Sequence, residues 1–281
     1  MRVITWNVAR RVSRIAEQAM ALAGREPDVV ALQEVTRGTV SLWRAALETI
    51  GLRGARCSLD DADPKRAPAA RRVTGVLIAT RARSRPQARL GVPWPETTLA
   101  VLAGAVRVDT VHVPNAGNGW VKVRTLQAVR EGCASGGSAP RIVCGDFNVP
   151  RREHPDGTVV SFARDSRERL RPERGVEWDA AELGVVPGLH DLGFQDAFRT
   201  LHGYDRREPS WTFRRMGGHD GGWRLDHLFA SEALEVLGCR YHHAWRDAGL
   251  SDHAALEADV RPSGRSRGRA ASGEGPGGTA T

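Results

Sequence analysis

The chain has 281 residues, of which 41% are hydrophobic, so it can bury a substantial core, and a single domain is the expected organisation. Its formal net charge of +8 comes almost entirely from arginine, which favours polyanions such as nucleic acid, although a GC-rich coding genome would also enrich arginine. No apolar run of about 18 residues occurs, and Met1 leads directly into an alternating segment, so neither a membrane span nor a signal peptide is expected.

Short runs typical of β-strands recur along the chain. They alternate in polarity or are short and apolar, and turn-forming residues separate them. The predicted strands cover residues 2–8, 28–35, 73–80, 99–113, 141–144, 210–214, 225–230 and 254–260. Apolar residues spaced by three and four predict helices at residues 12–23, 120–131 and 188–198.

The order of these elements favours one class of fold. Strands follow strands over long stretches without a helical crossover, which favours an α/β sandwich of mixed sheets with outer helices over a doubly wound parallel sheet. Residues 150–186 are polar and arginine-rich with little periodicity, which predicts an insertion on the surface. Residues 60–89 carry a net charge of +5 and surround a Pro/Ala-rich patch that predicts a mobile loop. Residues 261–281 predict a disordered basic tail after a domain of residues 1–260.

The cysteines bear on the compartment. The four cysteines are widely spaced and form no CxxC pair, which gives little support to a zinc site or a disulfide framework. A reducing, cytoplasmic setting is therefore the expectation.

Acidic, amide and imidazole side chains end nearly every predicted strand and are followed by a turn. A rigid sheet can bring groups at its strand ends together at one site. The residues at these ends are Asn7, Glu34, His112, Asn115, Asp146, Asn148, Asp226, His227, Asp252 and His253. We therefore expect a functional site built from strand ends.

The spacing of Asp146, Phe147 and Asn148 places both polar side chains on one face of an extended chain, while Phe147 points into the core. Hydrolysis of a phosphodiester requires a hard cation to neutralise developing charge, a carboxylate to orient and deprotonate water, and donors for the non-bridging oxygens. Asp146 would act on the water. Glu34 and Asp252 supply oxygen ligands that suit Mg²⁺ or Mn²⁺.

His253 is expected to pair with Asp226 and to stay partly cationic, because a nearby carboxylate favours the charged imidazole. It would then stabilise the transition state at phosphorus. Taken singly, each candidate has an ordinary alternative: Asn7 as a helix cap, Glu34 as a surface acid and Asp146 as a turn residue. The functional prediction rests on the ordered set.

Six segments, taken in order over residues 1–260, resemble the motifs of the endonuclease/exonuclease/phosphatase superfamily. They are Thr5-Trp6-Asn7, Leu32-Gln33-Glu34-Val35, Val111-His112-Val113-Pro114-Asn115-Ala116-Gly117, Gly145-Asp146-Phe147-Asn148, Gly222-Trp223-Arg224-Leu225-Asp226-His227 and Ser251-Asp252-His253. The resemblance implies a four-layered α/β sandwich, in which two mixed, mainly antiparallel sheets are flanked by helices. It places the site where the strand ends of both sheets meet.

The resemblance also implies roles at a metal site. Glu34 matches the family's metal ligand and Asn7 matches the asparagine that supports the metal site, while Asp252 lies beside the metal. The expected cofactor is Mg²⁺ or Mn²⁺.

Further roles concern the phosphate. Asp146 matches the acid that aligns the nucleophilic water, and Asn148 matches its phosphate-binding companion. Asp226 and His253 match the pair that holds the scissile phosphate. His112 occupies a position that is tyrosine in many exonuclease III-like repair enzymes and histidine in the pancreatic deoxyribonuclease-like and phosphatase branches, which leaves the subfamily open.

Two stretches resemble the abasic-site endonucleases. One contains Asn115, and the other contains Trp211, Trp223 and Leu225, which would line a pocket for a baseless sugar. The alternative is that these aromatic residues belong to the core. Against this branch, Glu34 is followed by Val-Thr, where the repair enzymes usually carry a small residue and a lysine.

The expected function is thus a DNA nuclease of the 3′ exonuclease or abasic-site endonuclease type, acting as a monomer on DNA. A lipid or inositol-phosphate phosphohydrolase of the same superfamily is the first alternative, and the absence of a membrane anchor disfavours it. A catalytically silent nucleic-acid-binding member is the second alternative, which the complete acid and histidine set disfavours.

Overall fold

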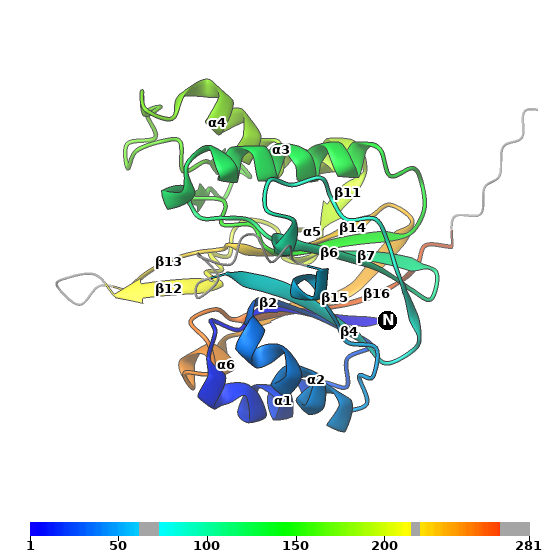
Figure 1. Ribbon diagram of the computed structural model, residues 1–281. Helices are drawn as coiled ribbons and strands as arrows, with labels where there is room; N and C mark the ends of the chain where they lie inside the picture. The colour runs from blue at the N-terminus through cyan, green and yellow to red at the C-terminus, as the bar shows by residue number, and fades with distance from the viewer. Residues whose placement is uncertain (62–72, 215–219, 265–281) are drawn as a thin grey trace, which may run out of the picture.

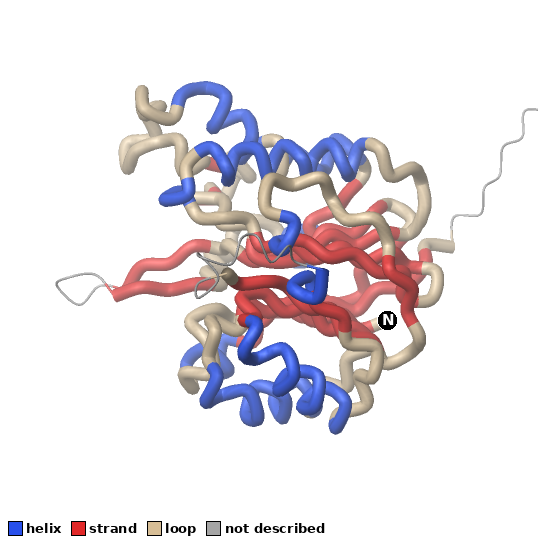
Figure 2. The backbone as a smooth tube through the Cα atoms, in the orientation of Figure 1, coloured by secondary structure: helices blue, strands red, loops and turns tan. Residues whose placement is uncertain are grey.

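The computed structural model describes residues 1–61, 73–214 and 220–264 (Figure 2). Its strands are β1 (Arg2–Asn7), β2 (Val29–Thr36), β3 (Arg56–Cys57), β4 (Thr74–Thr80), β5 (Ser84–Pro86), β6 (Thr98–Ala103), β7 (Val106–His112), β8 (Arg141–Asp146), β9 (Arg152–Glu153), β10 (Val159–Val160), β11 (Phe194–Asp196), β12 (Trp211–Arg214), β13 (Asp220–Trp223), β14 (Asp226–Ser231), β15 (Leu234–His242) and β16 (Ala255–Pro262). Its α-helices are α1 (Ile15–Ala23), α2 (Val40–Thr49), α3 (Trp120–Ala134), α4 (Gly175–Leu183), α5 (Ala197–His202) and α6 (His243–Asp247).

Two six-stranded sheets form the centre of the molecule. The first has the strand order β15-β16-β1-β2-β4-β3, and the second has the order β11-β14-β8-β7-β6-β5. The β1–β2 and β7–β8 pairs are parallel, and the other pairs in these two sheets are antiparallel. Figure 1 shows α1, α2 and α6 on the outer face of the first sheet, and α3 and α4 on the outer face of the second. The predicted four-layered sandwich is confirmed.

The side-chain alternation along the strands explains these layers. In β1, Val3 packs between the two sheets, whereas its neighbours Ile4 and Trp6 face the α1 and α2 layer. A third apolar cluster lies between the second sheet and α3 and α4, and Val143 of β8 belongs to it. Because both faces of the central strands are covered, they consist largely of apolar residues.

Several predicted boundaries are wrong. Residues 99–113, predicted as one strand, form the β6–β7 hairpin, because Gly104 has a φ of +62° and reverses the chain within an apolar run. Residues 188–198, predicted as a helix, contain a 3-10 helix (Gly188–Leu192), then β11 and the start of α5, with Gly193 in a left-handed conformation between them. The predicted elements also omit α2 and β15.

The prediction that residues 150–186 form a surface insertion is also wrong. Its helix α4 packs on α3, and Trp178 of α4 is buried in the apolar cluster beneath them. Glu182 is buried as well and accepts a 2.6 Å hydrogen bond from the buried ammonium of Lys122 on α3. A short helix whose buried face carries charged groups has little apolar periodicity, which is why its sequence suggests a surface segment.

The remaining expectations concern the ends of elements and the environment. β16 continues through Pro262, while residues 265–281 of the expected tail and residues 62–72 of the expected loop lie outside the described residues. All four cysteines are buried and free. Within the described ranges, no helix has the length and apolar character needed to cross a membrane.

Candidate active site

The predicted site residues gather where strands of both sheets end. They line one cavity of about 1380 Å³, larger than the roughly 300–1,000 Å³ usual for small-molecule sites, which favours an extended substrate. The predicted residues that line it are Glu34, His112, Asn115, Asp146, Asn148, Trp211, Trp223, Leu225, Asp252 and His253. Asn7 and Asp226 are buried behind this surface and contact Asp146 and His253, respectively.

Strand register aligns three of these residues in the second sheet. Asp146 at the end of β8 lies opposite His112 of β7 on one side and opposite Asp226 of β14 on the other. Gly145 precedes it with a φ of +141°, and a Cβ there would lie 1.9 Å from the carbonyl oxygen of Val111. Only glycine permits this close approach of β7 and β8, which brings His112 beside Asp146.

The first sheet presents Glu34 through an irregularity in β2. The pairing of β2 with β4 shifts between Leu32 and Val35, and Glu34 within this shift has a φ of +60°. Asn148, which also lines the cavity, adopts a similar φ of +53°. Left-handed conformations are costly for residues with a Cβ and are typical of functional sites, so this strain supports a role for both side chains.

Asn7 joins the acids of the two sheets. Its side-chain nitrogen Nδ2 donates to Oδ2 of Asp146 at 3.0 Å and to Oε1 of Glu34 at 3.3 Å. Its Oδ1 accepts a hydrogen bond from the backbone N–H of Ala9 at 3.0 Å. The contact with Ala9 is a local turn and does not cap a helix, so the side chain of Asn7 is used to hold the two carboxylates.

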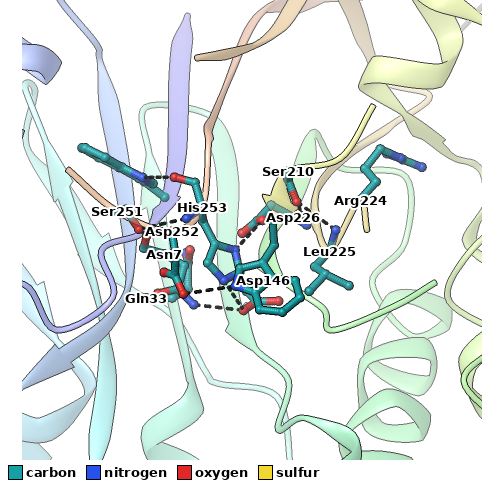
Figure 3. Close-up of polar contacts among 12 residues, drawn as sticks. Asn7, Gln33, Asp146, Ser210, Arg224, Leu225, Asp226, Ser251, Asp252 and His253 are labelled. Atoms are coloured by element: carbon teal, nitrogen blue, oxygen red, sulfur yellow. Dashed lines mark hydrogen bonds and ion pairs between the residues drawn. The ribbon is translucent and has the colours of Figure 1, made fainter. Parts of the chain in front are cut away.

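Asp226 and His253 form a buried pair, as predicted. His253 Nδ1 and Asp226 Oδ2 are 2.7 Å apart, and His253 Nε2 lies 3.9 Å from Oδ2 of Asp146 (Figure 3). Burial alone would lower the pKa of His253, but the charge and hydrogen bond of Asp226, together with the charge of Asp146, raise it to about 10. The imidazole therefore carries a positive charge at neutral pH.

Burial also raises the pKa of Asp146, and the nearby charge of Asp226 adds to this effect, while the charges of His253 and His112 oppose it. A carboxylate with a raised pKa is a better proton acceptor than an exposed one. His112 Nε2 lies 3.9 Å from both Asp146 Oδ2 and Glu34 Oε1, so it completes the group around Asp146.

Hydrogen bonds from two serines and one tryptophan hold His253 and Asp226 in position, and Figure 3 labels the two serines. Ser251 donates to the carbonyl oxygen of Asn7 at 2.6 Å and accepts the backbone N–H of His253 at 3.1 Å. Ser210 accepts the backbone N–H of Asp226 at 3.1 Å. Trp6 donates its indole N–H to the carbonyl oxygen of His253 at 3.0 Å. Hydrogen bonds from β1 and from the segments that precede β12 and β16 thus fix the positions of His253 and Asp226.

Aromatic side chains form one wall of the cavity, which we call the aromatic wall: Phe162, Trp211 and Trp223. Trp211 and Trp223 stack with ring centroids 5.3 Å apart, and Phe213 and Phe162 approach Trp223 to 4.9 and 5.1 Å. The predicted Trp211 and Trp223 therefore line the cavity, contrary to the alternative that they are core residues. Trp211 also donates its indole N–H to Asp252 at 3.1 Å.

The two amides differ in how their side chains are engaged. Asn148 donates to the carbonyl oxygen of Val113 at 2.8 Å, which fixes its orientation at the cavity. Asn115 uses Oδ1 to accept the backbone N–H of Gly117 at 3.0 Å. The hydrogen bonds of Asn115 leave its own side-chain N–H groups available to a ligand in the cavity.

The cavity residues that were not predicted include Arg10, Lys122 and Phe162. Arg10 pairs with Glu34, with Nε and Oε2 3.0 Å apart. Lys122 donates to the carbonyl oxygen of Asn148 at 3.0 Å, and Phe162 belongs to the aromatic wall. Arg10 lies three residues after the Asn7 motif, which is a usable signal, but no local pattern marks Lys122 or Phe162.

The charge balance of the site favours a cation. The carboxylates are Glu34, Asp146, Asp226 and Asp252, and the cationic groups beside them are Arg10 and His253. Oδ1 of Asp226 is buried without a hydrogen-bond partner among the described residues. Oxygen donors and excess negative charge suit a hard divalent cation.

Two groups of residues could hold such an ion. Asp146, Asp226 and His253 place ligand atoms within 4.8 Å of one another. However, Nδ1 of His253 is bonded to Asp226 and its pKa is raised, and a protonated imidazole has no lone pair for a metal. The predicted carboxylates Glu34 and Asp252 are therefore the better ligand candidates.

Residues 4–253 match the model of the Endonuclease/Exonuclease/phosphatase family. An exodeoxyribonuclease III of Haemophilus influenzae is 27% identical over 99 residues, which cover 34% of this chain and 36%, about a third, of that relative.

Solved structures share the fold over nearly the whole chain. An AP endonuclease from Archaeoglobus fulgidus superposes with a TM-score of 0.69 and 20% identity, covering 92% of this chain and 98% of its own. The 3′ phosphatase NExo from Neisseria, bound to a product DNA hairpin, superposes with a TM-score of 0.61 and 22% identity. The match covers 93% of this chain and 99% of that structure. D. rerio TDP2 complexed with a single-strand DNA product superposes with a TM-score of 0.62 and 16% identity, covering 93% of this chain and 98% of that structure.

Proposed function

The chain belongs to the Endonuclease/Exonuclease/phosphatase family, as its six ordered motifs predict, and from this premise we propose that it is a divalent-metal-dependent phosphodiester hydrolase acting on DNA. One observation carries the proposal. Hydrogen bonds and close ionic contacts connect Glu34 through Asn7 to Asp146, and Asp146 through His253 to Asp226, at the junction of the two sheets.

The geometry around Asp146 supports a role for this residue in activating the water. Its Oδ2 accepts from Asn7 and lies 3.9 Å from Nε2 of the charged His253, so a water between Asp146 and the cavity would be oriented by a fixed carboxylate. Asp146 would take the proton of that water as it attacks phosphorus. His253 would place its positive charge against the non-bridging oxygens, where negative charge develops in the transition state.

Glu34 and Asp252, supported by Asn7, would hold Mg²⁺ or Mn²⁺. A bound cation of this kind supplies charge neutralisation at the phosphate and the leaving oxygen. Arg10 pairs with Glu34 from the cavity side and would adjust its position when the cation binds. Asn148 and Asn115 line the same cavity and would bind or orient the phosphodiester.

DNA is the substrate class that fits the cavity best. The cavity is wide, its aromatic wall offers stacking surfaces, and the chain carries a net charge of +8. Trp211, Trp223 and Leu225 would admit a base-free deoxyribose or an unpaired 3′ end beside Asp146. Relatives with the same fold include an AP endonuclease and a 3′ phosphatase bound to DNA, which supports the same class.

The test compares four substrates with the purified full chain. A duplex with one abasic analogue, the intact duplex, a duplex with a recessed 3′ end and an inositol phosphate are incubated with Mg²⁺, with Mn²⁺ and with a chelator. We expect metal-dependent cleavage of the abasic or 3′-end duplex. Cleavage of the inositol phosphate alone would replace DNA by the alternative substrate class.

The same assay tests the role of Asp146. Asp146→Asn should lose about 10²–10⁴-fold in turnover and should still bind the duplex, because the amide keeps the shape of the carboxylate but cannot accept the proton. Asp191→Asn, at an exposed aspartate far from the cavity, is the matched control. Unchanged turnover in Asp146→Asn would refute the role, and wild-type protein that binds but never cleaves would indicate the silent binding member.

A further inference from the structure

A second cavity of about 480 Å³ lies next to the active-site cavity, and Trp223 borders both. We call it the arginine cavity. Its lining includes six arginines against three acids, an excess of three positive charges. The arginines are Arg151, Arg152, Arg199, Arg206, Arg207 and Arg224, and the acids are Glu153, Asp205 and Glu208. Its size is within the range of ligand-binding pockets.

Four of these arginines are neutralised by carboxylates. Arg199 and Arg224 pair with Glu153 at 2.6 and 2.5 Å, and both side chains are buried. Arg206 pairs with Glu208 at 2.8 Å, and Arg152 pairs with Glu168 at 2.7 Å. These arginines support the fold at the cavity wall.

Among the described residues, no carboxylate pairs with Arg151 or Arg207. Within the same part of the chain, the Arg207 guanidinium donates only to the carbonyl oxygen of Gly222, at 3.2 Å. The guanidinium of Arg151 has neither a hydrogen bond nor an ion pair with any residue that the structure describes. Partial burial lowers the pKa of Arg151, and the positive charges of Arg171, Arg152 and Arg174 lower it further, while the charge of Asp165 opposes them. An anion bound in the arginine cavity would reduce this repulsion on Arg151.

The position of the arginine cavity relates it to the reaction. Arg151 follows Asn148 by three residues, and Asn148 lines the active-site cavity. Leu225 lines the active-site cavity while its neighbour Arg224 lines the arginine cavity, and Figure 3 shows the Arg224 side chain directed away from Asp146. The two cavities thus lie on opposite sides of the segment that carries Trp223.

Resting on the proposed function, we propose that the arginine cavity binds a backbone phosphate of the same nucleic-acid strand, next to the phosphodiester that reacts. A strand carries one phosphate for roughly every 3.4 Å of helix axis, so a strand leaving the active site past Trp223 brings further phosphates to Arg151 and Arg207. A guanidinium group can bind a phosphate through two parallel hydrogen bonds, and the arginine cavity offers two such groups, those of Arg151 and Arg207.

The arrangement makes affinity depend on substrate length. A strand that ends at the reacting phosphate cannot reach the arginine cavity, whereas a longer strand gains the contacts with Arg151 and Arg207. Each phosphate contact also contributes about 0.7–0.9 to the slope of log affinity against log salt. Arg151 and Arg207 therefore act on binding and leave the chemical step to the residues around Asp146.

The experiment measures binding by fluorescence anisotropy in the Asp146→Asn background, so that the substrate stays intact. Oligonucleotides of about 3 and about 20 nucleotides are titrated between about 50 and 200 mM salt. The Arg151→Gln/Arg207→Gln double variant should lose on the order of tenfold in affinity for the long strand and little for the short one. Its salt slope should fall by about one to two.

Controls separate this effect from general loss of charge or of folding. Arg85→Gln changes an exposed arginine on β5, the edge strand that pairs with β6. This variant should leave the affinities for the short and the long strand unchanged. The exposed single variant Arg207→Gln should keep the thermal stability of the parent and lose part of the long-strand affinity. Arg151→Lys, which keeps the charge, should retain the salt slope.

Two results would overturn the inference: an equal loss of affinity for short and long strands, or no loss for the long strand. The active parent protein makes the failures distinguishable. If it cleaves no nucleic acid, the proposed function fails. If it cleaves nucleic acid but the double variant keeps the length dependence, only the role of the arginine cavity fails.

Discussion

Two buried clusters of charged side chains, which adjoin at residues 224–227, have different roles. The active-site cluster contains Asp146, Asp226 and His253, and the neighbouring cluster contains Glu153, Asp196, Arg199, Arg224 and His227. Both contain aspartate and histidine, but only the second contains arginine. In the second cluster, two carboxylates face two guanidinium groups, and each carboxylate is within 3 Å of at least one of them.

The difference lies in charge balance and in access to the cavity. The second cluster is neutralised internally, and the pKa of both carboxyls lies below its ordinary value because the charge of Arg224 and the hydrogen bonds of the partners together outweigh the effect of burial. The active-site cluster has an excess of carboxylates, a raised pKa at Asp146 and a buried oxygen of Asp226 without a partner among the described residues. Removing one partner from a buried ion pair is strongly destabilising, whereas buried charges without a full set of partners are typical of binding and catalytic sites.

The largest effect is expected from breaking the balanced cluster. Glu153→Gln removes the charge that faces Arg199 and Arg224, so two buried guanidinium groups lose their shared partner. The free energy of unfolding should fall by about 3–5 kcal/mol. Urea unfolding measures it, and turnover per folded molecule should be retained. A loss of turnover without a loss of stability would contradict the distinction between the clusters.

His253→Gln is expected to have the next largest effect, and this effect is on turnover and not on the free energy of unfolding. The amide keeps a hydrogen bond to Asp226 but removes the positive charge beside Asp146. Turnover should fall by about 10²–10³-fold, because the charge that faces the transition state is lost. Steady-state kinetics and thermal unfolding check this. His190→Gln, at an exposed histidine, should change neither quantity.

A smaller effect is expected from pH. The pKa of Glu153 is about 2 in the folded protein, below its ordinary value of 4.5, because the charges of Arg224 and Arg199 oppose the effect of burial. The stabilisation is therefore complete above pH 4.5 and is lost as the pH falls towards 2. The melting temperature should fall across this window in the wild type. The fall should be smaller in Glu153→Gln, and an equal fall would show that other carboxyls dominate acid unfolding.

The smallest effect is expected at the contact between the aromatic wall and the proposed metal ligand. Trp211→Phe preserves an aromatic ring for stacking on Trp223 but removes the indole N–H that binds Asp252. Affinity for Mn²⁺, measured by calorimetry in the Asp146→Asn background, should weaken by about 2- to 10-fold. Trp223→Phe lines the same cavity without contacting Asp252 and should leave the affinity unchanged. Equal effects of both variants would remove the role of the Trp211 contact.

The sequence supports the class of fold better than the individual boundaries. The central strands are predictable because their apolar runs are local, and β1, β2, β4, β8 and β14 appear where expected. The β6–β7 turn is hidden because Gly104 lies between alanines within an apolar stretch. α4 is hidden because its buried face carries Glu182, whose partner Lys122 lies 60 residues away. A buried ion pair gives neither of its segments an apolar pattern.

By itself, the sequence determined the family, the layered fold and the set of polar residues at strand ends, because short motifs and apolar periodicity are properties of neighbouring residues. Only the tertiary structure decided how Asn7 joins Glu34 to Asp146 and how His253 meets Asp226. It also decided which arginines are neutralised and which remain free at the arginine cavity. These contacts join residues far apart in the chain, so they depend on strand register, glycine-dependent close packing and the balance of buried charges.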